Sequence, residues 1–197
     1  MMFQSEISKE EVADLDLIQY EGPIRVIDSL EDFKEEIHHI REQRVLGFDT
    51  ETRPSFKKGV VYPTSLIQLS TLDQAWLLRM GKIGYPKTLL DLFTREDILK
   101  VGLGLNDDIR RMRADFQFEP RGFLDLQQYV EAFRIEEKGL KKLSGIVLGR
   151  RISKSQQVSN WDAEVLTEAQ IRYAATDAWI CLMIYKQLRK SIEASHE

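Results

Sequence analysis

Apolar runs of strand length recur through the first two-thirds of the chain. They predict strands at residues 23–27, 45–51, 64–69, 75–78 and 99–103, and a short strand or turn at 123–125. Only a few polar residues separate the third run from the fourth, which favours a hairpin. Strands in a meander, followed by strands that alternate with helices, are typical of one α/β domain with a mixed sheet.

Helical spacing and capping residues predict the helices between these strands. Ser29, with Asp32 three residues later, resembles a capping box that opens a helix over residues 30–43. Further helices are expected near residues 88–93 and from about Asn106. We therefore expect helices to cover the sheet.

The last 70 residues are predicted to be mostly helical. Asp125 is expected to cap the helix that follows it. Thr167 is a second cap, with Gln170 at the third helical position, and the final helix should run to about Lys190.

The chain divides into a single globular domain with a short extension at each end. Residues 1–22 are expected to form an acidic N-terminal arm, with one short helix capped by Ser8. Residues 23–190 form the domain, and residues 191–197 a C-terminal tail. Repeats and Pro/Gly/Ser-rich linkers are absent from the sequence.

Composition narrows the classes of protein that remain. Hydrophobic residues make up 43% of the chain and charged residues 30%, as in ordinary globular proteins. No stretch approaches the roughly 20 apolar residues of a membrane span, and the acidic N-terminus lacks the features of a signal peptide. Cys181 is the one cysteine, so we expect a cytoplasmic location. One cysteine and three histidines make a zinc site implausible and leave carboxylates as metal ligands, which favours Mg²⁺ or Mn²⁺.

The net charge of −4 does not exclude a nucleic-acid partner. Residues 1–22 hold six acids and one lysine, so the rest of the chain is close to neutral. Where some of its acids face metal ions, the remaining surface of the body is basic.

Acidic residues interrupt an apolar strand at Asp49 and Glu51. Strand alternation places both side chains on one face of the sheet. Two neighbouring carboxylates on a half-buried strand repel each other unless a cation lies between them. A solvated strand face is the alternative interpretation.

Two further acidic elements follow in the chain. Tyr173 and Asp177 are four residues apart, so they share a helix face; a structural hydrogen bond between them is equally compatible with the spacing. Asp107 and Asp108 follow a buried strand, where they could simply favour the helix N-terminus. Together the three elements supply four carboxylates, which could hold two divalent cations about 3.5–4 Å apart for attack on a phosphodiester.

This ordered set of motifs resembles the DEDD superfamily of 3′–5′ exonucleases, in the subclass with tyrosine in the third motif. Ribonuclease D is similar, and the exonuclease domain of the Werner syndrome helicase more so. The motifs that carry the resemblance are Gly47-Phe48-Asp49-Thr50-Glu51, the run from Val101 to Ile109, and Tyr173-Ala174-Ala175-Thr176-Asp177-Ala178, with Gly139-Leu140-Lys141-Lys142-Leu143 and Val158-Ser159-Asn160-Trp161 between the second and third.

The resemblance implies a ribonuclease H-like mixed sheet flanked by helices. It also implies hydrolysis of terminal phosphodiesters of DNA or RNA with two divalent cations, Mg²⁺ or Mn²⁺, and release of nucleoside 5′-monophosphates. Tyr173 would orient the attacking water, and Asp108 is favoured over Asp107 because it directly precedes Ile109. The metal ligands carried over are Asp49, Glu51, Asp108 and Asp177.

A single-stranded or 3′-recessed nucleic acid would need further contacts. The basic segment 138–154 contains no acid, and Arg150 and Arg151 within it could contact phosphates or form only a solvated surface. Trp161 could stack on a base or pack in the core. Gln68 could reach the terminal sugar, although a hydrogen bond across the sheet is favoured, and Thr50 in the first motif is a further candidate contact.

Two other functions are compatible with the sequence. One is a catalytically silent nucleic-acid binding module of the same fold, against which the intact set of acids and Tyr173 argues. The other is a metal-dependent hydrolase of small phosphoesters.

Overall fold

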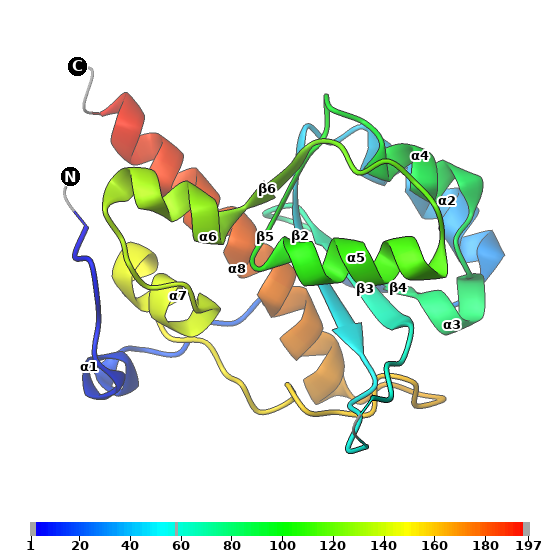
Figure 1. Cartoon of the computed structure of the whole chain (residues 1–197), viewed down its shortest axis with the longest axis horizontal. Coiled ribbons are helices and arrows are strands. Elements are labelled where there is room, and N and C mark those ends of the chain that lie inside the picture. The colour runs from blue at the N-terminus through cyan, green and yellow to red at the C-terminus, as the bar shows by residue number, and fades with distance from the viewer. Residues whose placement is uncertain (1–2, 58, 195–197) are drawn as a thin grey trace.

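The computed structural model, which describes residues 3–57 and 59–194, contains a mixed six-stranded sheet with helices on both faces (Figure 1). The strand order is β1-β4-β3-β2-β5-β6. Strand β2 is central, antiparallel to β3 and parallel to β5, and the predicted β3–β4 hairpin is present. The strands are β1 (Ile24–Ile27), β2 (Val45–Thr52), β3 (Thr64–Ser70), β4 (Ala75–Arg79), β5 (Leu99–Gly102) and β6 (Phe123–Asp125). All six predicted strands are confirmed.

Three helices of the domain begin at the side chains that were expected to cap them. Ser29 Oγ accepts a hydrogen bond from Asp32 N, and Asp125 accepts one from Gln127 N. Thr167 forms a full capping box with Gln170. The helices are α1 (Lys9–Asp14), α2 (Leu30–Arg41), α3 (Met80–Ile83), α4 (Lys87–Phe93), α5 (Leu105–Asp115), α6 (Leu126–Tyr129), the 3₁₀ helix η1 (Val130–Phe133), α7 (Leu140–Leu148) and α8 (Glu168–Glu193). Helix α3 was not predicted, and α8 extends into the expected tail, whose residues 195–197 lie outside the described residues.

One part of the C-terminal third differs from the prediction, because residues 149–167 form no helix. Gly149 ends α7 in the left-handed conformation, with φ of 62°. Beyond it, Ser153 and Asn160 accept hydrogen bonds from nearby backbone N–H groups, which competes with helix formation. The segment instead crosses the face of the molecule between α7 and α8 (Figure 1).

Helix α8 packs directly on the centre of the sheet. A Cβ atom at Gly47 would lie 2.0 Å from the carbonyl oxygen of Ala178, so only glycine allows this approach. Leu66 and Leu77 of the sheet contact Ala174 and Ala175 of the helix. On the opposite face, apolar residues of α2, α4 and α5 form the largest core cluster.

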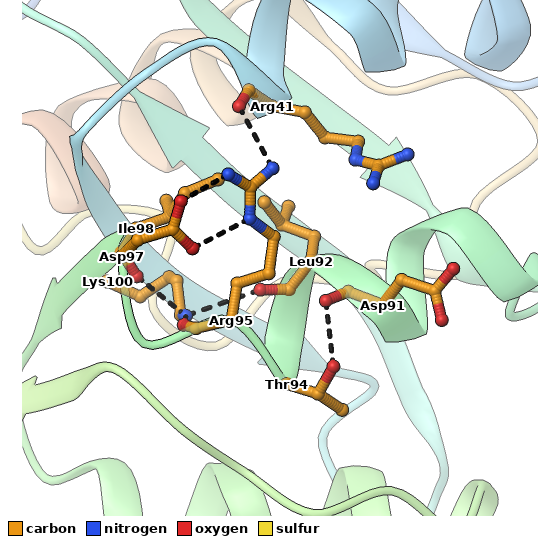
Figure 2. Close-up of polar contacts among 8 residues, drawn as sticks. All are labelled: Arg41, Asp91, Leu92, Thr94, Arg95, Asp97, Ile98 and Lys100. Atoms are coloured by element: carbon orange, nitrogen blue, oxygen red, sulfur yellow. Dashed lines mark hydrogen bonds and ion pairs between the residues drawn. The ribbon is translucent and has the colours of Figure 1, made fainter.

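Lys100 is a fully buried cation on β5, drawn in Figure 2. Its Nζ donates hydrogen bonds to the carbonyl oxygens of Leu92, Arg95 and Ile98, at 3.3, 2.7 and 2.8 Å. Burial lowers the pKa of Lys100 to about 8. The side chain therefore links the C-terminal end of α4 and the following turn to β5.

The acidic N-terminal arm packs against the body, and Ser8 caps α1 as expected. Val12 and Tyr20 are buried. Residues 15–18 run beside Arg151: Ile18 N donates to Arg151 O at 2.8 Å, and Arg151 Nε donates to Leu15 O at 2.8 Å. The arm thus holds the start of the non-helical segment.

Within the described part of the chain, every helix falls short of the length and apolar character that crossing a membrane requires.

We expect Lys100→Met to destabilise the fold, because the carbonyl oxygens of Leu92, Arg95 and Ile98 lose the hydrogen-bond donor that Nζ provides. The free energy of unfolding should fall by about 1–3 kcal/mol. Lys186→Met, at an exposed position of α8, should change it by less than about 0.5 kcal/mol. Urea unfolding followed by circular dichroism measures both, and equal effects would contradict this role for Lys100.

Arg150 and Arg151 form a matched pair for the arm contact. Arg151→Ala removes the bond to Leu15 O and should lower Tm by about 2–4 °C. Arg150→Ala removes an exposed contact to Asp16 at 3.6 Å and an exposed hydrogen bond to the neighbouring Gly149 O, and should leave Tm nearly unchanged. Thermal unfolding of both variants is the measurement; a larger shift for Arg150→Ala would reverse the assignment.

Candidate active site

Three carboxylates from β2 and α8 meet where these elements pack together. Oxygen atoms of Asp49, Glu51 and Asp177 lie within 4.8 Å of one another. Tyr173 lies one turn before Asp177 on α8, and its hydroxyl is close enough to lower the pKa of the Asp177 carboxyl. The alternation on β2 and the four-residue spacing on α8 therefore bring these side chains together as predicted.

Asp108 lies beside this cluster, in the first turn of α5. Its Oδ1 accepts a hydrogen bond of 2.6 Å from Thr50 Oγ1, next to Asp49 and Glu51 on β2. Asp107 points away: its side chain is 74% exposed and pairs with Arg110. This arrangement favours Asp108 over Asp107, although Asp108 is not one of the three residues whose oxygen atoms converge.

The N-terminus of α5 is held in place by Asp125. Its two carboxylate oxygens accept hydrogen bonds from Gly104 N and Leu105 N, both at 2.9 Å. Gly104 has a φ of 71°, a conformation that favours glycine. Asp125, predicted only as a helix cap, therefore also positions the turn that carries Asp108.

Burial and mutual repulsion make the carboxylates hard to ionise. Burial is the main cause of each rise in pKa, which reaches about 9 for Glu51, about 7 for Asp177 and about 6 for Asp108. The pKa of Asp49 is raised well above its usual range by burial, then by Asp177 and Glu51. A cation bound among them would remove this penalty, and a set of carboxylate oxygens suits a hard divalent ion.

Asp49, Glu51 and Asp177 line a pocket of about 340 Å³, together with Tyr173. The pocket is also lined by Lys138 and Leu140 near the start of α7, and by Ile152, Ser153 and Lys154 of the non-helical segment. The Lys154 ammonium lowers the pKa of Asp177, opposing the effect of burial. Lys138 and Lys154 are thus the basic residues of segment 138–154 that line the pocket. In the sequence, only their position in that acid-free segment indicated that they could belong to the site.

Of the residues proposed to contact nucleic acid, Thr50 lines the pocket and the other four do not. Gln68 and Trp161 are 0% and 1% exposed, so neither side chain is accessible to a strand; Trp161 packs in the core, 6.0 Å from the Tyr173 ring. The expected hydrogen bond of Gln68 across the sheet is also not formed among the described residues. Arg150 and Arg151 contact the arm and do not line the pocket. Gln68 and Trp161 are thus excluded by burial, and Arg150 and Arg151 are directed to the arm. Neither the burial nor the arm contact could be seen in the local sequence.

Known proteins are similar to this chain in sequence. The family model described as 3′-5′ exonuclease matches residues 24–193. The human Exonuclease 3′-5′ domain-containing protein 2 is 36% identical over 73% of this chain and 25% of its own length. The mouse bifunctional 3′-5′ exonuclease/ATP-dependent helicase WRN is 33% identical over 73% of this chain and 11% of its own. The chain thus spans at most about a quarter of these relatives.

A solved structure shows the same fold. The EXO domain of Nibbler from Aedes aegypti superposes with a TM-score of 0.79 and 28% identity, covering 91% of this chain and 93% of that domain. The resemblance seen in the sequence and its mixed α/β sheet are confirmed. With nearly the whole domain matched by the family model, the chain belongs to the 3′-5′ exonuclease family.

Proposed function

We propose that this chain removes nucleotides one at a time from the 3′ end of a nucleic-acid strand. The observation that carries the proposal is the convergence of Asp49, Glu51 and Asp177 in a pocket that Tyr173 also lines. Asp108 completes the set of ligands for two divalent cations, Mg²⁺ or Mn²⁺. Such cations, when bound, supply the Lewis acidity and positive charge that phosphodiester hydrolysis needs.

Tyr173 positions the attacking water in this proposal. Burial raises its pKa above the ordinary value, so the phenol keeps its proton at neutral pH and is a poor base. Tyr173 instead lines the pocket beside Asp177, where its hydroxyl can orient a water by a hydrogen bond. Lys154 contributes positive charge on the opposite wall, where a phosphate would benefit from it.

The size of the pocket supports removal of single nucleotides. A volume of about 340 Å³ is at the small end of ligand pockets, near the size of one nucleotide. The non-helical segment closes the wall opposite the carboxylates. A terminal nucleotide fits such a pocket, whereas an internal stretch of duplex does not.

The connection between β2 and β3 is a candidate surface for the rest of the strand. It leaves the catalytic strand just after Glu51 and exposes Phe56 (88%) and Val61 (76%). Arg53 and Lys57 lie on the same connection. Aromatic stacking combined with phosphate contacts is the usual means of binding a single strand, so this surface supports a single-stranded or 3′-recessed substrate.

A cytoplasmic location is also proposed. It rests on Cys181, the one cysteine of the sequence, which is buried as a free thiol.

Labelled oligonucleotides test the proposed function. With a 5′ label and Mn²⁺, digestion should give a ladder that shortens from the 3′ end; with a 3′ label, the label should leave at once as a mononucleotide. EDTA should stop both. Binding without digestion would indicate the silent module, and hydrolysis of p-nitrophenyl phosphate alone would indicate a hydrolase of small phosphoesters.

Asp108→Asn and Asp107→Asn separate the two neighbouring acids. The first should reduce turnover by at least about 10–100-fold while the fold is retained, because it removes one of the repelling charges. The second should leave turnover nearly unchanged, since Asp107 faces solvent. Mn²⁺-dependent rates and Tm are the measurements, and the opposite ranking would move the ligand to Asp107.

A further inference from the structure

Gln68 is a buried polar side chain with unused hydrogen-bonding capacity. All seven residues of β3 are buried, and Gln68 is 0% exposed. Among the described residues, neither its amide nitrogen nor its amide oxygen has a hydrogen-bond partner. Burying an unpaired amide costs free energy, so we expect the Gln68 amide to have a hydrogen-bond partner in the working protein.

The strand register places Gln68 directly beside a proposed metal ligand. Gln68 pairs with Asp49 across the antiparallel β2–β3 ladder. Residues paired in this way point to the same face, with Cβ atoms about 4.5–5.5 Å apart. Gln68 is therefore the cross-strand neighbour of Asp49, on the face that α8 covers.

The Gln68 side of this pair is closed to substrate. Leu66, two residues before Gln68, and Leu77, its partner on β4, pack against Trp161 and the alanines of α8. At Gly47 the helix backbone approaches the sheet too closely for even a methyl group. A nucleic-acid strand cannot reach the Gln68 amide, which must act inside the protein.

The chemistry of the neighbouring groups selects the partner. An amide N–H group needs an acceptor, and the oxygen atoms of the Asp49 carboxylate are acceptors. The indole Nε1 of Trp161, also without a partner among the described residues, can only donate. Ser70 Oγ is likewise unpaired and lies two residues along the same face of β3, where it can serve the amide oxygen.

We infer that Gln68 is a positioning residue for the proposed metal centre. With a cation bound, its amide nitrogen would donate to one oxygen of the Asp49 carboxylate, which would leave the other oxygen for the cation. The inference rests on the proposed function, because it takes Asp49 as a metal ligand. Partners of this kind typically change metal affinity or activity by about 10–100-fold.

Gln68→Met tests the inference, because it keeps the length of the side chain and removes both polar atoms. Calorimetric titration of Mn²⁺ into the protein without nucleic acid should show an affinity about 10–100-fold weaker than in the wild type. Tm of the metal-free protein should stay the same or rise, because an unpaired buried amide is removed. Leu77→Met, a volume-conserving change at the paired buried position, is the control and should leave Mn²⁺ affinity unchanged.

Gln68→Asn is the second variant; it keeps an amide but withdraws it by one methylene, and should weaken Mn²⁺ binding to a smaller extent. Unchanged Mn²⁺ affinity in the folded Gln68 variants, with a wild type that binds Mn²⁺ and digests oligonucleotides, would overturn the inference and leave the proposed function standing. A wild type that binds no Mn²⁺ would overturn both.

Discussion

The contact between the backbone of α8 and the centre of β2 is the constraint on which the rest of the site depends. At Gly47 the helix comes so close that a Cβ atom would lie 2.0 Å from the Ala178 carbonyl oxygen. Asp177 directly precedes Ala178, so the same approach brings its carboxylate to Asp49 and Glu51. Small residues on both elements are thus the reason that acids far apart in the sequence converge.

That convergence works against folding. Burial raises the pKa of each carboxylate, and like charge raises it further for Asp49 and Glu51, so ionising these groups without a cation is unfavourable. The rest of the structure offsets this cost away from the site. Lys100 links α4 to β5, and the buried Arg79 guanidinium donates to the carbonyl oxygens of Ala163 and Glu164, which holds the segment after Trp161. The unfavourably buried charges thus lie at the site, while the buried polar groups Lys100 and Arg79 around it have hydrogen-bond partners, as is usual for functional centres.

Much of this arrangement could be predicted from the sequence, because it depends on local pattern. Apolar runs gave the strands, two-residue alternation gave the shared face of Asp49 and Glu51, and capping side chains gave the starts of α2 and α8. The failures involve long-range partners. Nothing near Arg151 in the sequence indicates that Leu15, 136 residues earlier, accepts its hydrogen bond. The periodicity of apolar residues also could not show that the side chains of Gln68 and Trp161 are buried and therefore cannot face a substrate.

The two sides of the pocket are built by different means, and this has a consequence for substrate choice. The carboxylate side belongs to β2 and α8, where a change of shape is limited by the contact at Gly47. The opposite side is an irregular segment, held at its start by an arm that precedes residues 24–193, the part matched by the family model. That segment carries Ser153 and Lys154 into the pocket, so the arm supports this side of the pocket through its contact with Arg151. Under the proposed function, the helix–strand contact fixes the acids, and the segment that the arm secures would set the fit of the terminal nucleotide.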